Sequence, residues 1–299
     1  MTVSAADVRR GAPGHPAWRP MTLLRAVLLA VALPAVLTGC ATTRPRLPDG
    51  PGTPLPDFLP LFETAVADCG QVQHLDALLR LRGRGGGVGL NSRVRVRVGL
   101  SAPGSARLEG LAPFGAPVFF LVARPGEATL WLTREKRVLR DVPFADMLEG
   151  LVGVSLSPGA LRSVLTGCLV EQPRPTTART IGDWIVVELT GGAVAYLRRV
   201  DGDYRLTAGR RDGFEIYYDQ FVGGLAREVR VVSDSRGALD SEPATDVTVS
   251  LSQVDTNVAP PDSAFSIGIP PDVLPMTLQE LRGAGPLDAP PDPPASDAR

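Results

Sequence analysis

The feature that most constrains the fold is a series of short segments in which apolar and polar residues alternate, separated by residues that favour turns. Residues 93–98 read Arg-Val-Arg-Val-Arg-Val, the period of two that a strand shows when only one of its faces is buried. Gly191-Gly192 and Asp201-Gly202 are typical of hairpin turns. The strands predicted in this way span 93–100, 105–112, 117–123, 127–133, 136–140, 183–190, 193–200, 203–209, 213–219, 226–233, 245–253 and 264–269.

Three other segments have apolar residues at helical spacing. Residues 61–79 predict an amphipathic helix of about five turns. Residues 144–152 and 158–167 predict two short helices, the second beginning at Pro158 and ending at Gly167. The order helix, strands, two helices, strands predicts an α+β fold in which a strongly curved antiparallel sheet or barrel carries its helices on one face.

The N-terminal part of the chain resembles a bacterial export signal. Arg25 precedes an apolar run over 26–37, which is shorter than the roughly 20 residues of a membrane-spanning helix. Leu37-Thr38-Gly39-Cys40 follows and resembles the lipobox of bacterial lipoproteins. The resemblance implies that Cys40 is acylated through its sulfur and that 1–39 is removed. An uncleaved or conventionally cleaved signal is the alternative. We expect Met21 to be the true start and 1–20 to be a mis-assigned extension, because a start at Met21 gives a compact leader.

Composition predicts one folded region between two extended ones. Residues 40–56 and 283–299 are rich in Pro and Gly, which predicts a tether at one end and a disordered tail at the other. The folded domain is then expected over 57–282. Without 1–39, which hold four arginines and one aspartate, 27 basic residues face 31 acidic ones. That balance argues against binding to nucleic acid.

Two cysteines remain besides Cys40. Cys69 lies on the apolar face of the first predicted helix, and Cys168 directly follows the glycine that ends the third. Beyond the inner membrane the milieu is oxidising, so the pair is a disulfide candidate. Two buried free thiols are the alternative.

The sequence offers no group of residues for catalysis or for metal binding. His74 is the only histidine after 1–39, and a zinc site needs three or four clustered ligands. A Gly-x-Ser-x-Gly elbow is absent. The segment 83–88 lacks the last glycine of a dinucleotide-binding loop, and a flexible turn or bulge is the better interpretation. We therefore expect no enzyme, no cofactor and no metal.

Three segments, in this order, resemble the LolB family of outer-membrane lipoproteins, which receive other lipoproteins from a periplasmic carrier. Residues 81–84, Leu-Arg-Gly-Arg, are similar to the Leu-x-Gly-x of the family's opening strand. Residues 107–122 follow its pattern of strand, turn, Pro, apolar residue, Gly and strand. Residues 161–167 end in Leu-x-Gly, as the corresponding family segment does. The two additional cysteines and the longer segment 170–182 depart from that pattern.

The resemblance to this LolA/LolB-type superfamily implies a fold and a function. The fold would be an incomplete β-barrel whose concave, apolar side is covered by helices and holds acyl chains of lipoproteins or lipids. A carrier of the LolA type would be the partner, and the protein is expected to be a monomer. The alternatives are a structural or assembly lipoprotein with a filled core, and a carrier of free lipid or glycolipid.

The resemblance also implies a membrane-insertion loop. In that family a turn carries an exposed apolar residue between Pro and Gly, which inserts cargo into the bilayer. The matching residues here are Pro113, Phe114 and Gly115, with an apolar rim expected from Ala112, Pro117 and Val118. An ordinary core phenylalanine near a turn is the alternative. Residue 41, the second residue of the expected mature chain, is Ala rather than the Asp that often retains lipoproteins at the inner membrane. We therefore predict that the protein lies at the periplasmic face of the outer membrane.

Overall fold

The computed structural model describes residues 46–85, 88–90, 95–112, 117–233 and 245–284. The chain divides into two units, Met1–Arg46 and Leu47–Arg299, and the fold described below is that of the second unit. Its helices are α2 (Leu59–Gly70), α3 (Phe144–Val152), α4 (Pro158–Thr166), α5 (Leu278–Ala284) and a 3₁₀ turn, η2 (Asp262–Phe265). Its strands are β1 (Thr53–Pro54), β2 (His74–Gly85), β3 (Val88–Leu90), β4 (Arg95–Ser101), β5 (Ser105–Leu111), β6 (Pro117–Arg124), β7 (Glu127–Leu132), β8 (Arg137–Arg140), β9 (Pro175–Ile181), β10 (Trp184–Leu189), β11 (Val194–Val200), β12 (Asp203–Arg211), β13 (Phe214–Asp219), β14 (Glu228–Ser233), β15 (Asp246–Thr256) and β16 (Leu274–Pro275).

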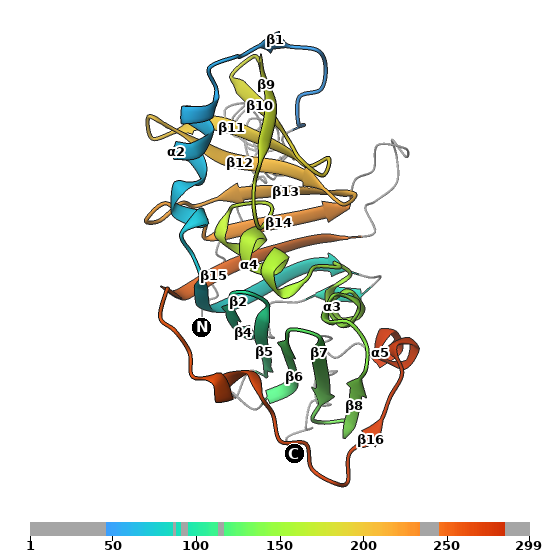
Figure 1. Cartoon of the computed structure of the whole chain (residues 1–299). Helices are drawn as coiled ribbons and strands as arrows, with labels where there is room; N and C mark the ends of the chain where they lie inside the picture. The colour runs from blue at the N-terminus through green and yellow to red at the C-terminus, as the bar shows by residue number, and fades with distance from the viewer. Residues whose placement is uncertain (1–45, 86–87, 91–94, 113–116, 234–244, 285–299) are drawn as a thin grey trace, which may run out of the picture. The chain divides into compact units, whose positions relative to one another are not determined.

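All sixteen strands belong to one sheet, which is built from two runs of hairpins (Figure 1). The strand order is β1-β9-β10-β11-β12-β13-β14-β15-β2-β4-β5-β6-β7-β8-β16, with β3 paired to β2. The two runs meet where β15 pairs with β2 in antiparallel register, with Thr248 opposite Arg82. β16 alone among these strands pairs in parallel, with β8. The order begins at β1 and ends at β16, so the described sheet is open, and the predicted α+β incomplete barrel is confirmed.

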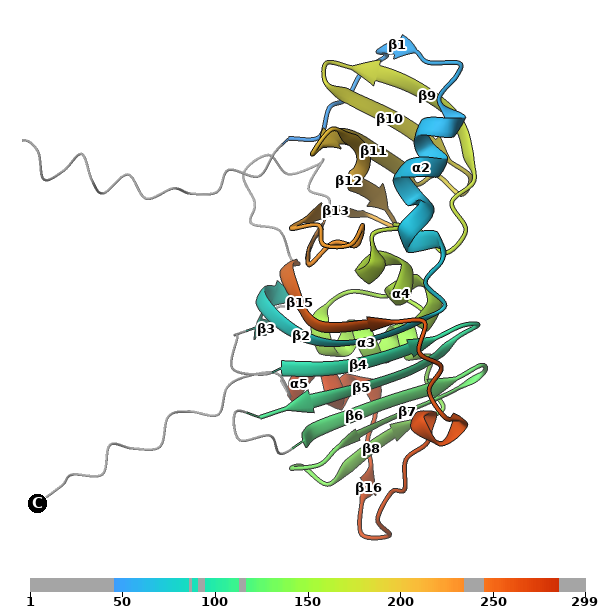
Figure 2. The ribbon, with the colours of Figure 1, turned by 90° about the vertical axis from the view of Figure 1, so that its left-hand side faces the viewer.

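One face of the sheet, called the inner face here, is covered by helices. α2 packs on β12, α3 on β2 and β7, and α4 on β4 and β5. Figures 1 and 2 both place α2 beside β11 and β12, with α4 near its end. Alternate residues of the strands, such as Leu79 and Val98, join buried residues of all three helices in a single core cluster. Burying the apolar side of each alternating strand in this way is what holds the sheet and helices together.

The first helix is shorter than its periodicity predicted. α2 ends at Gly70, residues 71–73 connect it to strand β2, and 74–79 of the expected helix belong to that strand. The prediction over 71–79 was wrong because Leu75 and Leu79 fit a helical interval and also a strand alternation, and pairing with β4 and β15 selects the strand. His74 therefore lies in β2, where its Nδ1 is 2.8 Å from the Ser101 hydroxyl oxygen.

Most other predicted elements are confirmed to within a few residues. α4 begins as expected, with the Ser157 hydroxyl accepting a hydrogen bond from the Ala160 N–H, and ends at Gly167 in left-handed conformation. One prediction differs from the structure, since residues 264–269 form the end of η2 and an irregular segment rather than a strand. Residues 175–181, inside the segment 170–182 for which no element was predicted, form β9.

Gly83 and Gly85 do not form the flexible turn that the sequence suggested; both lie in β2. A β-carbon on Gly85 would overlap the backbone carbonyl of Val152, the last residue of α3. The hydroxyl of Thr245 also donates a hydrogen bond, 3.1 Å long, to the Gly153 carbonyl oxygen. The missing β-carbon of Gly85 therefore allows the last residue of α3 to lie directly against strand β2.

The segment expected to be a tether is packed against the sheet from Leu47 onward. Leu47 is 2% exposed and lies in a small cluster on the opposite, outer face with Val186, Tyr196 and Ala208. β1 then pairs with β9 at the edge of the sheet. Because these contacts join segments far apart in the chain, the Pro- and Gly-rich composition of 47–56 did not reveal them.

A buried arginine holds this segment to the outer face. Arg210 of β12, whose side chain is 9% exposed, donates hydrogen bonds to Asp49 (2.6 Å), Glu215 (3.2 Å) and the Tyr196 hydroxyl (2.7 Å). Tyr217 donates to the other oxygen of Glu215, at 2.6 Å. Burial disfavours the charged guanidinium, but the hydrogen bonds to Asp49 and Glu215 hold the pKa of Arg210 above its ordinary value.

Helix α5 extends two residues into the tail that was expected from 283. The helix opens with a capping box, in which Thr277 and Glu280 each accept a hydrogen bond from the backbone N–H of the other. The hydrogen bonds that the N–H and hydroxyl of Thr277 donate to the Glu280 carboxylate, and one from Arg137, lower the pKa of that carboxyl to about 2. Leu281 on the same helix is fully buried, and α5 packs on α3.

Candidate functional site

A cavity lined only by apolar residues lies between the inner face of the sheet and helices α3 and α4. Its floor comes from β2, β4, β5, β6, β14 and β15, where the inward residues include Leu81, Leu108 and Val231. Its roof comes from α3, α4 and the connection between them, for example Leu151 and Leu165. We call this space the inner cavity.

The spacing of apolar residues in α3 places several of them over the cavity. Leu151 and Val152 lie three and four residues after Leu148, so the three side chains lie on one face of the helix and line the inner cavity. Leu161, Val164 and Leu165 do the same on α4. The sequence predicted both helices from this spacing, but it did not indicate that their buried faces enclose a cavity.

The inner cavity has a volume of about 70 Å³. Ligand pockets usually measure about 300 to 1,000 Å³, so side chains fill most of the space between helices and sheet in this conformation. With no polar side chain among the described residues that line it, the cavity offers nothing there for proton transfer or for ion binding. Its lining suits an apolar ligand.

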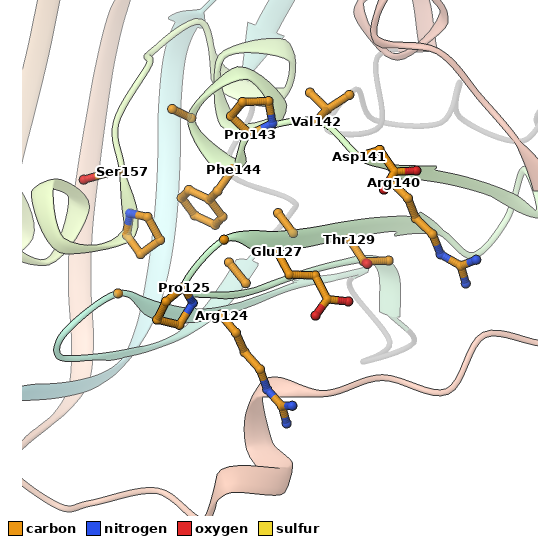
Figure 3. Close-up of a pocket in the computed structure, with 16 residues that line it drawn as sticks. Arg124, Pro125, Glu127, Thr129, Arg140, Asp141, Val142, Pro143, Phe144 and Ser157 are labelled. Carbon is orange, nitrogen blue, oxygen red and sulfur yellow. The ribbon is translucent and has the colours of Figure 1, made fainter.

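A second cavity, of about 640 Å³, lies at the ends of α3 and α4 where both helices begin (Figure 3). Its walls are the turn between β6 and β7, the connection from β8 to α3, and the first residues of the two helices. In Figure 3, Phe144 and Pro143 lie above strands β6 and β7, whereas the side chains of Arg124 and Glu127 point away from that side. We call this space the outer cavity.

The expected disulfide is present. Cys69 in the last turn of α2 is bonded to Cys168, with Cα atoms 5.4 Å apart. Both residues are buried, and the bond joins the end of one covering helix to the residue beyond the cap of another. The bond thus links α2 covalently to α4, one of the two helices that roof the inner cavity.

Other predicted site residues lie outside the part of the chain that the structure describes. These are Cys40 and the loop residues Pro113, Phe114 and Gly115. The flanking residues do not form the expected apolar rim, because Ala112 and Val118 are buried in the core; Pro117 is exposed. Strand β6 begins at Pro117, and its second and third residues, Val118 and Phe119, are both buried.

Within the described ranges, no helix is long and apolar enough to cross a membrane. Histidine, cysteine and acidic side chains of the same ranges do not gather in groups of three or more that could hold a metal ion.

No known family model matches the chain, and no curated protein sequence matches it. Similar solved structures include a LolA superfamily protein from Nitrosomonas europaea, 10% identical, with a TM-score of 0.44 over 69% of this chain and 97% of that one. A DUF1329 family protein from Desulfovibrio piger is 13% identical, with a TM-score of 0.40 over 70% of this chain and 96% of that one. The lipoprotein LppX from Mycobacterium tuberculosis is 10% identical, with a TM-score of 0.30 over 68% and 98%.

At such identities, and with TM-scores below 0.5, these similarities carry no argument about the family or the ligand of this chain. The function has to be argued from the inner cavity and the residues around it.

Proposed function

We propose that the protein is a membrane-anchored lipid-binding protein, which accepts an acyl chain in the inner cavity and helps to insert lipoproteins into the outer membrane. The observation that carries the proposal is the inner cavity itself, because every residue that lines it is apolar. A buried space without a hydrogen-bonding group favours hydrocarbon over water or any polar ligand. The lipobox at Cys40 supports a position beside a membrane, where such ligands are found.

Binding requires the cavity to widen from about 70 Å³. Moving α3 and α4 away from the sheet would expose apolar side chains such as Leu151 and Leu165 to water, which opposes opening in the absence of ligand. An acyl chain covers the same surface and adds about 0.8 kcal/mol for each methylene that it buries. A chain of about ten methylenes would therefore gain about 8 kcal/mol to offset the rearrangement.

The small volume also favours a second candidate, a structural or assembly lipoprotein whose core is filled by its own side chains. The two differ in one measurable property, since a filled core binds no lipid. An equilibrium binding experiment therefore separates them, provided that a variant fills the inner cavity without disturbing the fold.

Replacing Val164 with Phe is expected to provide that variant. Val164 is 1% exposed and lines the inner cavity, so the larger ring takes up empty space and leaves stability unchanged or raised. Titration with a fluorescent long-chain fatty acid should show saturable binding to the parent chain and at least about tenfold weaker binding to Val164→Phe. The titration uses the full chain with Cys40→Ala, purified without detergent.

The matched control is Val187→Phe, at a position in β10 that is equally buried but lines neither cavity. Overpacking there should cost about 1 to 3 kcal/mol of stability while leaving the affinity for the probe unchanged. Equal affinities of the parent chain and Val164→Phe would contradict binding in the inner cavity. A parent chain that binds no probe would support the filled core instead.

Anchoring through Cys40 predicts the location of the protein. Replacing Cys40 with Ala should move the protein from the membrane pellet to the soluble periplasmic fraction, because the acyl chains that hold it to the bilayer are lost. Fractionation followed by immunoblotting measures this directly. Continued sedimentation of the Cys40→Ala chain with membranes would contradict lipidation at this residue.

Delivery of cargo is proposed to depend on Phe114 between Pro113 and Gly115. Leaving a phenylalanine ring in water forgoes about 1.5 to 3 kcal/mol of burial, which is reasonable for a residue that meets a bilayer. Phe114→Glu should preserve the thermal midpoint and lipid affinity but prevent transfer of a bound lipoprotein from a LolA-type carrier into liposomes. An unfolded Phe114→Glu chain, or normal transfer by it, would contradict the insertion role.

A further inference from the structure

The outer cavity has no part in the function proposed so far, although its volume of about 640 Å³ is within the usual range for a ligand pocket. Much of its wall is apolar, contributed by Phe144, Val142, Pro143 and Pro158. Charged side chains occur on the strand side of the same cavity, where Figure 3 shows Arg124 and Glu127 pointing away from Phe144. The cavity thus has an apolar part and a polar rim.

The inner and outer cavities follow the same two helices. On α3, Phe144 lines the outer cavity, while Leu148, one turn further along the same face, lines the inner one. On α4, Pro158 lines the outer cavity and Leu161 the inner one. One helical turn is about 5.4 Å, so a short distance along each helix separates the two spaces.

Phe144 is placed to separate them. Its ring is buried, with 6% of the residue exposed, and it belongs to the same core cluster as Leu148. Several other residues that line the outer cavity are small, including Ala123, Ala128 and Ala145. Rotation of one side chain, rather than displacement of a whole helix, would then be enough to connect the two spaces.

We propose that the outer cavity is the entrance through which an acyl chain reaches the inner cavity, with Phe144 as the gate. The polar end of the lipid remains at the rim, beside Arg124, Glu127 and Arg140. The inference rests on the proposed function, since it gives the route to the same binding site. It also predicts that entry and exit share one path, so a change in the entrance alters both rates.

The test measures the rates of uptake and release of a fluorescent long-chain fatty acid by stopped flow, with the full Cys40→Ala chain. Ala145 is partly exposed and lines the outer cavity, so Ala145→Trp narrows the entrance without altering the core. Both rates should fall about tenfold while the dissociation constant stays within about twofold, because the bound state is unchanged. Phe144→Ala, which removes the gate, should raise both rates.

The matched control is Ala65→Trp, at a partly exposed position of α2 that lines neither cavity; its rates should equal those of the parent chain. If Phe144→Ala proves unstable, Ala145→Trp still decides the question. Parent rates for Ala145→Trp, with equilibrium binding intact, would overturn the entrance and leave the proposed function standing. A parent chain that binds no fatty acid would refute the proposed function and the entrance together.

Discussion

Replacing Cys69 and Cys168 together by Ala is expected to lower the free energy of unfolding by about 4 to 5 kcal/mol. The two residues are 99 positions apart, so the disulfide closes a long loop in the unfolded chain and removes much of its conformational entropy. Alanine is apolar and small, which leaves the buried positions without an unpaired polar group. Urea denaturation of the oxidised parent and the double variant measures the difference.

The reduced parent chain is the control for the loss of sulfur packing, because it keeps both side chains but not the bond. It should resemble the double variant in stability. Hydrogen exchange should also become faster in α4 (Pro158–Thr166), since the bond ties the end of α2 to the residue beyond that helix. A loss of less than about 1 kcal/mol would contradict the stabilising role of the bond.

Replacing Arg210 with Met is expected to cost about 3 to 5 kcal/mol of stability. Arg210 and Glu215 are 9% and 7% exposed in their side chains and are joined by a 3.2 Å hydrogen bond. Removing the guanidinium leaves a buried carboxylate without that cation, and it also removes the hydrogen bond to Asp49 that holds the segment after Leu47. Thermal and urea denaturation of the full chain measure the loss.

The matched control is Arg97→Met, which breaks an ion pair with Asp76 in which both side chains are about half exposed. Exposed pairs contribute about 0 to 1 kcal/mol, so this change should be nearly neutral. Similar losses of unfolding free energy for the two variants would show that the cluster around Arg210 contributes no more to stability than an exposed ion pair does.

Local patterns predicted most of the fold. Alternating residues marked β4–β8 and β10–β15, and an initial proline and a terminal glycine marked α4, because the periods of strand and helix are properties of the local chain. Predictions failed where distant pairing decides the outcome. Residues 74–79 fit a helix or a strand, and pairing with β4 and β15 makes them a strand.

The site was partly predictable for the same reason. Apolar strand faces covered by helices were expected, as was the bond between Cys69 and Cys168. The volume of the inner cavity could not be predicted, because it depends on how closely the side chains of six strands and two helices approach one another. Arg210 was missed, since Asp49, Glu215 and Tyr196 come together only in the folded chain.

The central claim, that the inner cavity holds an acyl chain, is tested most directly by native mass spectrometry of the Cys40→Ala chain purified from bacterial cells without detergent. We predict an adduct with the mass of one acyl lipid on the parent chain, greatly reduced in Val164→Phe and retained in the Val187→Phe control. A parent chain that carries the mass of the bare polypeptide alone, and still does so after incubation with phospholipid vesicles, would contradict the claim.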